Sequence, residues 1–351
     1  MKKFLALLLV AVLVLGTTAA LAQEKMLISV ISKGEQHAFW QAVRKGAQDA
    51  ADKYNVEMFY YGPPSEADIV PQVEALKAEM AKGPKALALA ALSTDAVMTE
   101  LQEAIDKNIP IIGFDSGVPN APEGAIRATA STNNQNAAAL AAEKMLENEG
   151  LQAKLKEATA EKPVTVAVLS QDATSESVTG RTTGFVNKFV ELAGAYGVVE
   201  VQGHDLWAKK AENPTIILHV EIGASPKIDD MTNAANAILN KDNLAAIFCS
   251  NEGAVAGLLA ATADGSEFAE GARFGGILVA GFDAGAPQKN AVRNGWFIGS
   301  VTQDPYNIGY LAVELAYKAA NGEEVADVDT GAQWYTKDNI DEPNIAILVY
   351  D

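Results

Sequence analysis

The fold is decided by the stretch Ile277-Leu-Val-Ala-Gly-Phe-Asp283, in which a nearly all-apolar run leads into an aromatic residue and a carboxylate. Such a run is typical of a parallel strand that is buried on both faces. Ligands of open α/β sheets bind beyond the carboxyl ends of these strands, so Asp283 is either a binding residue or the cap of the next helix. The stretch Ile109-Pro-Ile-Ile-Gly-Phe-Asp115 has the same shape and the same ending. This repetition favours binding and predicts two similar lobes that face one cleft.

Strand-like and helical stretches alternate along the chain from Met26 onward. The strand-like run Val56–Tyr61, for example, follows the amphipathic stretch Phe39–Tyr54. A polar segment at 149–162, rich in Lys, Glu and Ala, is expected to be a surface connection, and the alternation restarts at Val164. This order is typical of βαβ units. The sequence therefore predicts an α/β protein with two doubly wound parallel-sheet lobes.

The first residues have the features of a secretory signal peptide. Two lysines precede the apolar run Phe4–Leu15, and Ala20-Leu21-Ala22 is a small-x-small cleavage site. The apolar run is short for a membrane anchor, and no cysteine stands at the cleavage site for lipid attachment. We expect residues 1–22 to be removed and the mature chain to begin at about Gln23, in the periplasm.

The composition excludes several classes of protein. The sequence has 27 Lys and Arg against 45 Asp and Glu, a formal net charge of −18, which is unsuited to nucleic acid or an anionic membrane surface. Cys249 is the only cysteine, so neither an internal disulfide nor a cysteine metal cluster can form. The histidines are scattered, and the motifs of nucleotide-binding loops, serine hydrolases and zinc proteases do not occur. We therefore expect no cofactor and no bound metal.

The polar residues at the predicted strand ends indicate a neutral polyhydroxylated ligand. Asp115, Asn251, Asp283 and Gln303 supply carboxylates and amides, which can form hydrogen bonds with sugar hydroxyls. Trp40 is expected beside the same strand ends, where it either stacks on the apolar face of a sugar ring or packs in the core. Asp115 and Asp283 are also the candidates for a glycosidase-like acid/base pair, which is the enzymatic alternative.

Several short motifs follow one another in a specific order along the chain. They are His37-Ala38-Phe39-Trp40, Ile109–Asp115, Ser131–Asn134, Arg181 with Gly184 and Phe185, Asn251 with Glu252, Val279–Asp283, and Gln303–Tyr306. With these motifs, nearly all of the chain after the signal peptide resembles the ribose-type periplasmic binding proteins of ABC sugar importers. The resemblance implies a periplasmic binding protein type I fold, in which two lobes joined by a three-crossing hinge close on the ligand.

The resemblance also implies a division of the chain and a set of partners. Lobe 1 is expected to comprise 23–131 and 304–335, and lobe 2 to comprise 132–303 and 336–351. The expected partners are a small sugar or polyol, the membrane permease of an ABC importer and, in addition, a chemoreceptor. The protein is expected to be a monomer, to bind no nucleic acid and not to be an enzyme.

Carried over position by position, the resemblance implies a set of ligand contacts. They are His37, Phe39, Trp40, Asp115, Ser116, Thr179, Arg181, Asn251, Asp283 and Gln303. Ser116 stands where some members have an arginine, and Thr179 where the family often has a sugar-binding arginine, so the ligand need not be ribose. Arg181 is either a contact or a structural residue near the hinge. Trp207, in an insertion-like segment at 204–220, is the candidate for the aromatic contact of lobe 2.

Two alternatives to a transport receptor stay open at this point. One is a secreted carbohydrate-acting enzyme that uses Asp115 and Asp283. The other is a sensory module that presents its ligand to a chemoreceptor or a kinase. A sugar-responsive repressor would share the fold, but it needs an N-terminal helix-turn-helix where this chain has its expected signal peptide.

Overall fold

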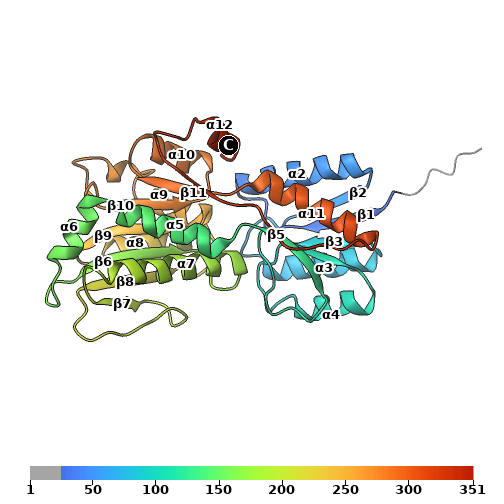
Figure 1. The fold of residues 1–351 in the computed structure, drawn as a ribbon, viewed down its shortest axis with the longest axis horizontal. Helices are drawn as coiled ribbons and strands as arrows, with labels where there is room; N and C mark the ends of the chain where they lie inside the picture. Colours follow the sequence, from blue (N-terminus) through green and yellow to red (C-terminus); the bar gives the residue numbers. More distant parts are fainter. Residues whose placement is uncertain (1–24, 351) are drawn as a thin grey trace, which may run out of the picture.

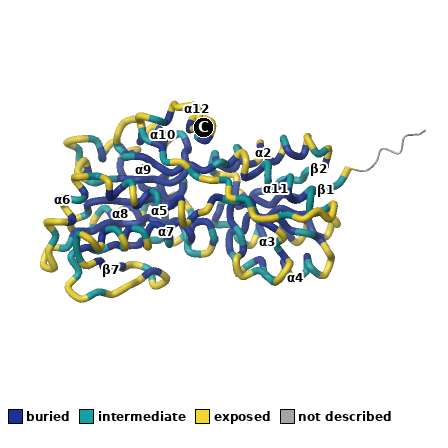
Figure 2. The backbone as a smooth tube through the Cα atoms, in the orientation of Figure 1, coloured by how far each residue is buried: buried dark blue, intermediate teal, exposed yellow. Residues whose placement is uncertain are grey.

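The computed structural model describes residues 25–350, which form two lobes connected by more than one passage of the chain (Figure 1). The expected signal peptide, 1–22, lies outside the described residues. Each lobe has a largely parallel sheet with helices on both faces, and buried residues run through both sheets and the junction between the lobes (Figure 2). The predicted α/β class with two doubly wound lobes is confirmed. Between residues 25 and 350, no helix combines the length and the hydropathy that a membrane span requires.

Lobe 1 contains a six-stranded parallel sheet in the order β12-β5-β4-β3-β1-β2. Its strands are β1 (Leu27–Ile31), β2 (Glu57–Tyr61), β3 (Ala86–Leu89), β4 (Ile111–Phe114), β5 (Ile126–Ser131) and β12 (Val328–Asp329). One face packs against α2 (Ala38–Tyr54) and α11 (Pro305–Ala320), and the other against α3 (Ile69–Ala81) and α4 (Met98–Asp106). Every residue of the central strand β3 is buried, as expected for a strand between two helical layers.

Lobe 2 contains a seven-stranded sheet in the order β13-β11-β10-β9-β6-β8-β7, in which only β13 is antiparallel. Its strands are β6 (Val164–Ser170), β7 (Val199–Gln202), β8 (Ile216–Ile222), β9 (Leu244–Cys249), β10 (Leu278–Phe282), β11 (Gly299–Thr302) and β13 (Gln333–Tyr335). One face packs against α5 (Asn134–Leu146), α6 (Glu149–Glu157) and α7 (Glu176–Ala193). The other face packs against α8 (Ile228–Leu239), α9 (Glu252–Ala260), α10 (Ala286–Arg293) and α12 (Pro343–Ala346), with the short 3-10 helix η1 (Ser266–Phe268) beside them.

The segment 149–162, predicted to be a surface connection, contains the helix α6. Asn148 caps this helix by accepting a hydrogen bond from the amide of Leu151 at 3.0 Å. Leu151 and Leu155, one turn apart, are buried in the core of lobe 2. Two apolar residues suffice to attach a short helix to a core, but they are too few to produce a clear periodic pattern in a polar stretch.

The chain passes between the two sheets at 132–133, 303–304 and 330–332. The last passage comes earlier than the predicted boundary after 335, because Gln333–Tyr335 pairs with β11 and so belongs to the sheet of lobe 2. The tail after this strand stays with lobe 2, where Ile340 and Ile345 are buried in its core.

The helices α2 and α11 touch at two glycines. A Cβ added at Gly309 would lie 1.8 Å from the carbonyl oxygen of Val43 in α2, and one added at Gly46 would lie 1.9 Å from that of Tyr306 in α11. Only glycine permits this approach, because backbone atoms cannot move aside as side chains can. The contact anchors α2, whose first turn reaches the boundary between the lobes.

We expect Gly309→Ala to lower the free energy of unfolding by about 2 kcal/mol or more, since overpacking typically costs about 1–3 kcal/mol and here the clash is with backbone. The measurement is urea unfolding followed by circular dichroism. Gly276→Ala is the matched control, because a Cβ there has no neighbour within 4 Å and no positive φ to strain it. Equal stability of the two variants would show that the helices separate easily.

Candidate functional site

The two Gly-Phe-Asp motifs end their strands in the same way. Asp115 follows β4 with a φ of 56°, and Asp283 follows β10 with a φ of 76°. Their backbone amides still pair with the neighbouring strands, donating to the carbonyls of Ala130 at 3.0 Å and Val301 at 2.7 Å. The left-handed conformation, which is uncommon for residues other than glycine, then turns the chain out of the sheet. Asp283 is not the cap of the next helix, because Gly285 holds that position.

A cavity lies between the lobes at the carboxyl ends of the central strands. Most of the predicted ligand contacts line it: His37, Phe39, Trp40, Asp115, Arg181, Asn251, Asp283 and Gln303. Four residues that had not been assigned as contacts also line it: Lys33, Glu66, Val178 and Glu252. Lys33 and Glu66 lie in the loops after β1 and β2, so the rule that ligands bind beyond strand ends would have identified both.

The predicted contacts Ser116 and Thr179 lie outside the cavity wall. Ser116 Oγ accepts a hydrogen bond from the amide of Ser177 at 3.2 Å, which joins the two lobes. Thr179 Oγ1 donates to the carbonyl one turn earlier in the chain at 2.7 Å, which turns it away from the cavity. Trp207 also lies elsewhere: it packs in the core of lobe 2, and its Nε1 donates to a threonine of α7 at 2.9 Å.

The carboxylate of Asp283 is held by donors from three directions. Its Oδ1 accepts from Gln303 Nε2 at 2.7 Å, and its Oδ2 accepts from the amide of Glu252 at 3.0 Å. Arg181 Nη1 lies 3.4 Å from the same Oδ2. The backbone carbonyl of Asp283 is fixed as well, because the hydroxyl of Tyr335 donates to it at 2.9 Å. The site therefore presents this carboxylate in one orientation.

Arg181 connects the cavity to the hinge. Its side chain is 3% exposed, and its Nε donates to Asn134 Oδ1 at 2.9 Å. The guanidinium carbon lies 3.9 Å from the centre of the Phe282 ring, an arrangement that combines cation–π attraction with packing. Asn134 begins α5 directly after the first passage between the lobes. Arg181 thus has both properties expected of it, a position on the cavity wall and a link to the hinge.

Asp115 is a buried carboxylate with few partners. Lys33 Nζ lies 3.4 Å from its Oδ2, and that oxygen accepts no hydrogen bond. Burial raises the pKa of Asp115, although the charges of Lys33 and Arg181 oppose the rise. Burial also disfavours the charged form of Lys33, but Asp115 and Glu66 outweigh it, so the pKa of this lysine is raised. Lys33 is therefore a buried cation, and it donates to Ser177 Oγ of lobe 2 at 2.9 Å.

Glu66 forms a second connection between the lobes. Its Oε1 accepts from Trp40 Nε1 at 2.8 Å, and its Oε2 accepts from Gln171 Nε2 of lobe 2 at 2.7 Å. Burial opposes ionisation, but the charge of Lys33 and the interaction with His37, together with these hydrogen bonds, hold the pKa of Glu66 below its ordinary value. The indole of Trp40 is consequently fixed at its polar end.

Phe39 and Trp40 belong both to the core of lobe 1 and to the cavity wall. Their rings meet edge to face with centroids 5.0 Å apart, and the residues are 5% and 2% exposed. The ring of Tyr350 lies 6.1 Å from that of Phe39, also edge to face. Tyr350 is tied to lobe 2, because its hydroxyl accepts from the amide of Ala284 at 3.2 Å. The chain terminus thus reaches across the boundary between the lobes.

The lobes are in contact across the cavity. Besides the bonds of Lys33 and Glu66, Thr174 Oγ1 of lobe 2 donates to the carbonyl of Leu92 in lobe 1 at 3.1 Å. The cavity has a volume of about 20 Å³, which is room for about one water molecule. A ligand larger than a water molecule can therefore enter only when the lobes move apart.

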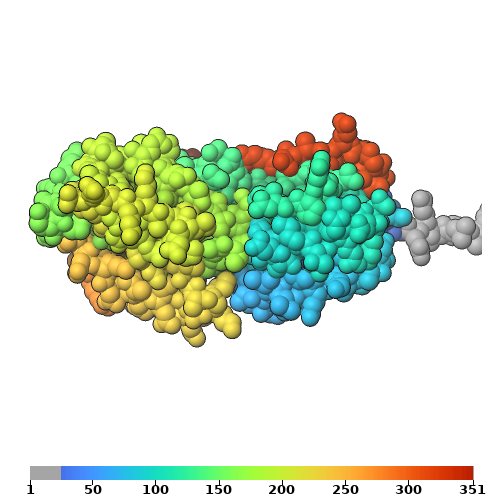
Figure 3. All heavy atoms as spheres, turned by 90° about the horizontal axis from the view of Figure 1, so that it is seen from below, coloured from blue at the N-terminus to red at the C-terminus, as the bar shows by residue number. Residues whose placement is uncertain are grey.

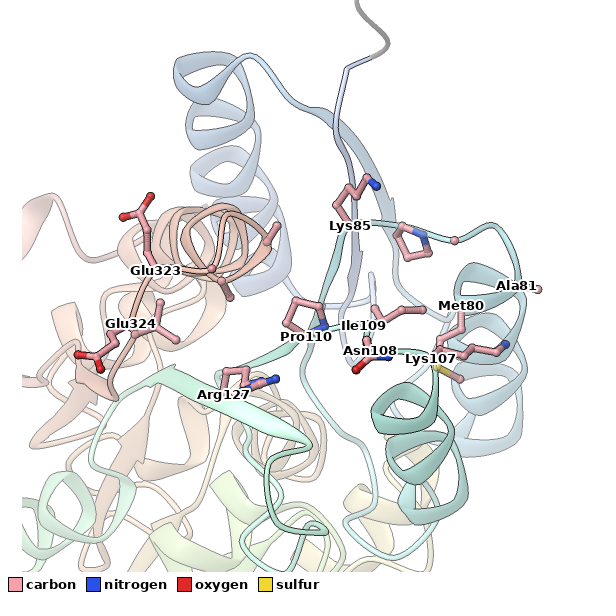
Figure 4. A pocket seen from close by; sticks show the side chains of 16 residues that line it. Met80, Ala81, Lys85, Lys107, Asn108, Ile109, Pro110, Arg127, Glu323 and Glu324 are labelled. Atoms are coloured by element: carbon pink, nitrogen blue, oxygen red, sulfur yellow. The ribbon is translucent and has the colours of Figure 1, made fainter.

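A larger hollow lies at the opposite end of lobe 1, with a volume of about 1060 Å³. Figure 4 shows the basic side chains of Lys85, Lys107 and Arg127 on one side of it and those of Glu323 and Glu324 on the other. It lies at the amino ends of β3, β4 and β5, whereas ligands of parallel sheets bind at the carboxyl ends. This hollow is therefore not the candidate site, although it is larger than the cavity between the lobes.

The cavity between the lobes is suited to hydrogen bonding rather than to metal or thiolate chemistry. Within the described part of the chain, no three His, Cys, Asp or Glu side chains come together as metal ligands. Cys249 is buried in the core of lobe 2, and burial raises the pKa of its thiol.

Glu252 is a titratable group on the cavity wall. It begins α9, and its buried Oε2 has no hydrogen-bond partner. Burial raises its pKa to about 7; His37 opposes the rise, and the charges of Asp283 and Glu66 add to it. A carboxyl whose pKa is higher in the folded chain stabilises the fold fully below its unfolded pKa, and this contribution is lost as the pH rises through the folded pKa.

We expect the free energy of unfolding of the natural chain to fall between pH 4.5 and pH 7 by up to about 3 kcal/mol more than that of Glu252→Gln, since one pKa unit corresponds to about 1.4 kcal/mol. Urea unfolding at a series of pH values measures both slopes. Glu324→Gln, an exposed carboxylate, is the control and should keep the slope of the natural chain. A Glu252→Gln slope equal to that of the control would contradict the raised pKa.

Comparisons with known proteins agree with this geometry. A family described as "Periplasmic binding protein domain" matches residues 28–324. The D-allose-binding periplasmic protein of Escherichia coli K12 is 24% identical over 332 residues, which cover 93% of this chain and 94% of that protein.

Solved structures share the whole fold. A protein from Brachyspira murdochii, described as an ABC transporter and LacI family transcriptional regulator, is 39% identical with a TM-score of 0.77; the match covers 93% of this chain and 99% of that one. A carbohydrate transporter solute-binding protein from Agrobacterium radiobacter, in complex with D-arabinose, is 25% identical with a TM-score of 0.75; the match covers 93% of this chain and 100% of that one.

Proposed function

Because the chain belongs to the periplasmic binding protein domain family, we propose that it is an extracytoplasmic solute-binding protein that captures a small sugar or related polyhydroxylated solute. It holds the solute between its lobes and delivers it to the permease of an ABC importer. It acts in the periplasm as a monomer, and presentation of the closed form to a chemoreceptor is a second use of the same event.

One observation carries the choice of ligand class. Three acceptor oxygens on the cavity wall are buried and have no hydrogen-bond partner: Asp115 Oδ2, Glu252 Oε2 and Gln303 Oε1. Buried acceptors without donors are costly, and a ligand that brings several hydroxyl donors removes this cost. Sugars and polyols are such ligands, because each hydroxyl both donates and accepts.

The other residues of the cavity wall supply hydrogen-bond donors and apolar rings, which a sugar also requires. Lys33 and Arg181 are cations that can donate to ring and hydroxyl oxygens, and Phe39 and Trp40 can cover an apolar ring face. The relatives support the same class, since one is named for D-allose and another was solved with D-arabinose.

Closure couples the ligand to the importer. In the closed form, the bond from Lys33 to Ser177 and that from Gln171 to Glu66 join the lobes. A sugar between the lobes replaces some of these bonds with its own to both walls, and its differential affinity for the closed form shifts the population towards that form. The permease can then recognise the closed form, which the bound sugar favours.

The first experiment is a thermal-shift screen of the mature chain against pentoses, hexoses, polyols and nucleosides, followed by calorimetry. A ligand that binds only the folded protein raises the melting temperature. Chromatography of the recovered ligand tests the alternative function: turnover of the sugar would favour an enzyme that uses Asp115 and Asp283. No shift with any member of the panel would overturn the ligand class.

We expect Asp283→Asn and Asp115→Asn to weaken binding of the sugar found in this screen by at least about 10-fold. Hydrogen bonds to a charged group contribute about 1.5–3 kcal/mol, and 1.4 kcal/mol is a factor of ten in affinity. Thr179→Ala is the control, since this side chain points away from the cavity, and it should bind like the natural chain. Natural affinity in both aspartate variants would exclude this cavity as the site.

A further inference from the structure

A second cavity adjoins the first at the boundary between the lobes. It has a volume of about 610 Å³, against about 20 Å³ for the inner cavity. Lobe 1 contributes the loops after β1 and β2, and lobe 2 contributes the starts of α8 and α10 together with one face of α9. Seen from below, the yellow segment of lobe 2 meets the blue segment of lobe 1 at the boundary between the lobes (Figure 3). We call it the outer cavity.

The outer cavity is continuous with the candidate site through two shared residues. His37 of lobe 1 and Glu252 of lobe 2 line both cavities. These two side chains form the wall between the cavities, and each comes from a different lobe. The wall therefore parts when the lobes separate, so a ligand held at the inner cavity can extend past it into the outer one.

The two cavities have opposite chemistry. The inner one is lined mainly by charged and amide side chains. The outer one has an apolar floor, which consists of Pro226, Ile228, Val255, Ala256, Leu259 and Pro287. Val255 and Leu259 are buried, whereas Ile228 is 50% exposed at the rim. Ile228 therefore offers apolar surface at the rim that a ligand can cover.

We infer that the outer cavity is a second subsite, which receives an apolar group carried by the sugar, so that the ligand class includes glycosides with an aryl or alkyl aglycone. This inference rests on the proposed function of the inner cavity. The inner wall satisfies the hydroxyls of the sugar ring, and the outer floor removes the aglycone from water.

The test compares ligands that differ only in the aglycone. For each of D-allose, D-ribose and D-arabinose, calorimetry measures the affinity of the free sugar and of its methyl and phenyl glycosides in both anomeric forms. We expect one phenyl glycoside to bind at least about 10-fold tighter than the matching methyl glycoside, from the apolar area that the phenyl ring buries. In Ile228→Asp, the ratio of the phenyl affinity to the methyl affinity should fall to about one.

Leu206→Asp is the matched control. Leu206 is also an apolar residue of lobe 2 with a mostly exposed side chain, at 60%, but it does not line the outer cavity. This variant should keep the preference for the phenyl glycoside, which excludes a general effect of a new surface charge.

The outcomes separate the inference from the proposed function. If free sugars bind but no phenyl glycoside binds better than its methyl partner, the inference is overturned, the proposed function stands, and the outer cavity is left to a protein partner. If Ile228→Asp keeps the preference, the aglycone lies elsewhere and the inference is also overturned. If neither sugars nor glycosides bind, the proposed function fails and the subsite fails with it.

Discussion

Buried charge at the boundary between the lobes is the constraint on which the rest of the structure depends. Asp115, Asp283 and Glu66 lie there with Lys33 and Arg181, almost fully removed from water. An unpaired buried charge costs several kcal/mol, so each of these groups needs a partner in the closed protein. The positions of the strand ends, the hydrogen bonds between the lobes and the link to the hinge all serve to supply those partners.

The two aspartates have unequal numbers of hydrogen-bond and ion-pair partners, and this difference is the basis of ligand binding. Asp283 is held by three donors, whereas Asp115 has an ion pair with Lys33 at 3.4 Å and an oxygen without any hydrogen bond. If every polar group of the cavity already had a hydrogen-bond partner in the protein, a ligand could add no hydrogen bonds there. A site in which one wall is rigid and the other is short of donors gains most from a solute that brings its own hydroxyl groups.

Much of the architecture was predictable because it rests on local patterns. Alternating strands and helices predicted two doubly wound lobes, and the repeated Gly-Phe-Asp ending predicted two carboxylates at one cleft. Where the local pattern was weak, a helix was missed: the segment predicted as a surface connection contains α6, which only Leu151 and Leu155 attach to the core. The predicted position of the last passage between the lobes was wrong, because the residue pattern of Gln333–Tyr335 does not indicate which of the two sheets this strand joins.

The sequence by itself determined the strands, the order of the motifs and the residue types at the strand ends, because these depend on hydrophobic periodicity and on neighbours along the chain. Only the tertiary structure decided which of these side chains face one another. Lys33 and Glu66 line the cavity, whereas Ser116 and Thr179 do not. Ser116 is bonded to the other lobe, and Thr179 is bonded to a carbonyl one turn earlier in the chain. The tertiary structure also raises the pKa of Glu252 to about 7, because the fold buries this carboxyl away from water.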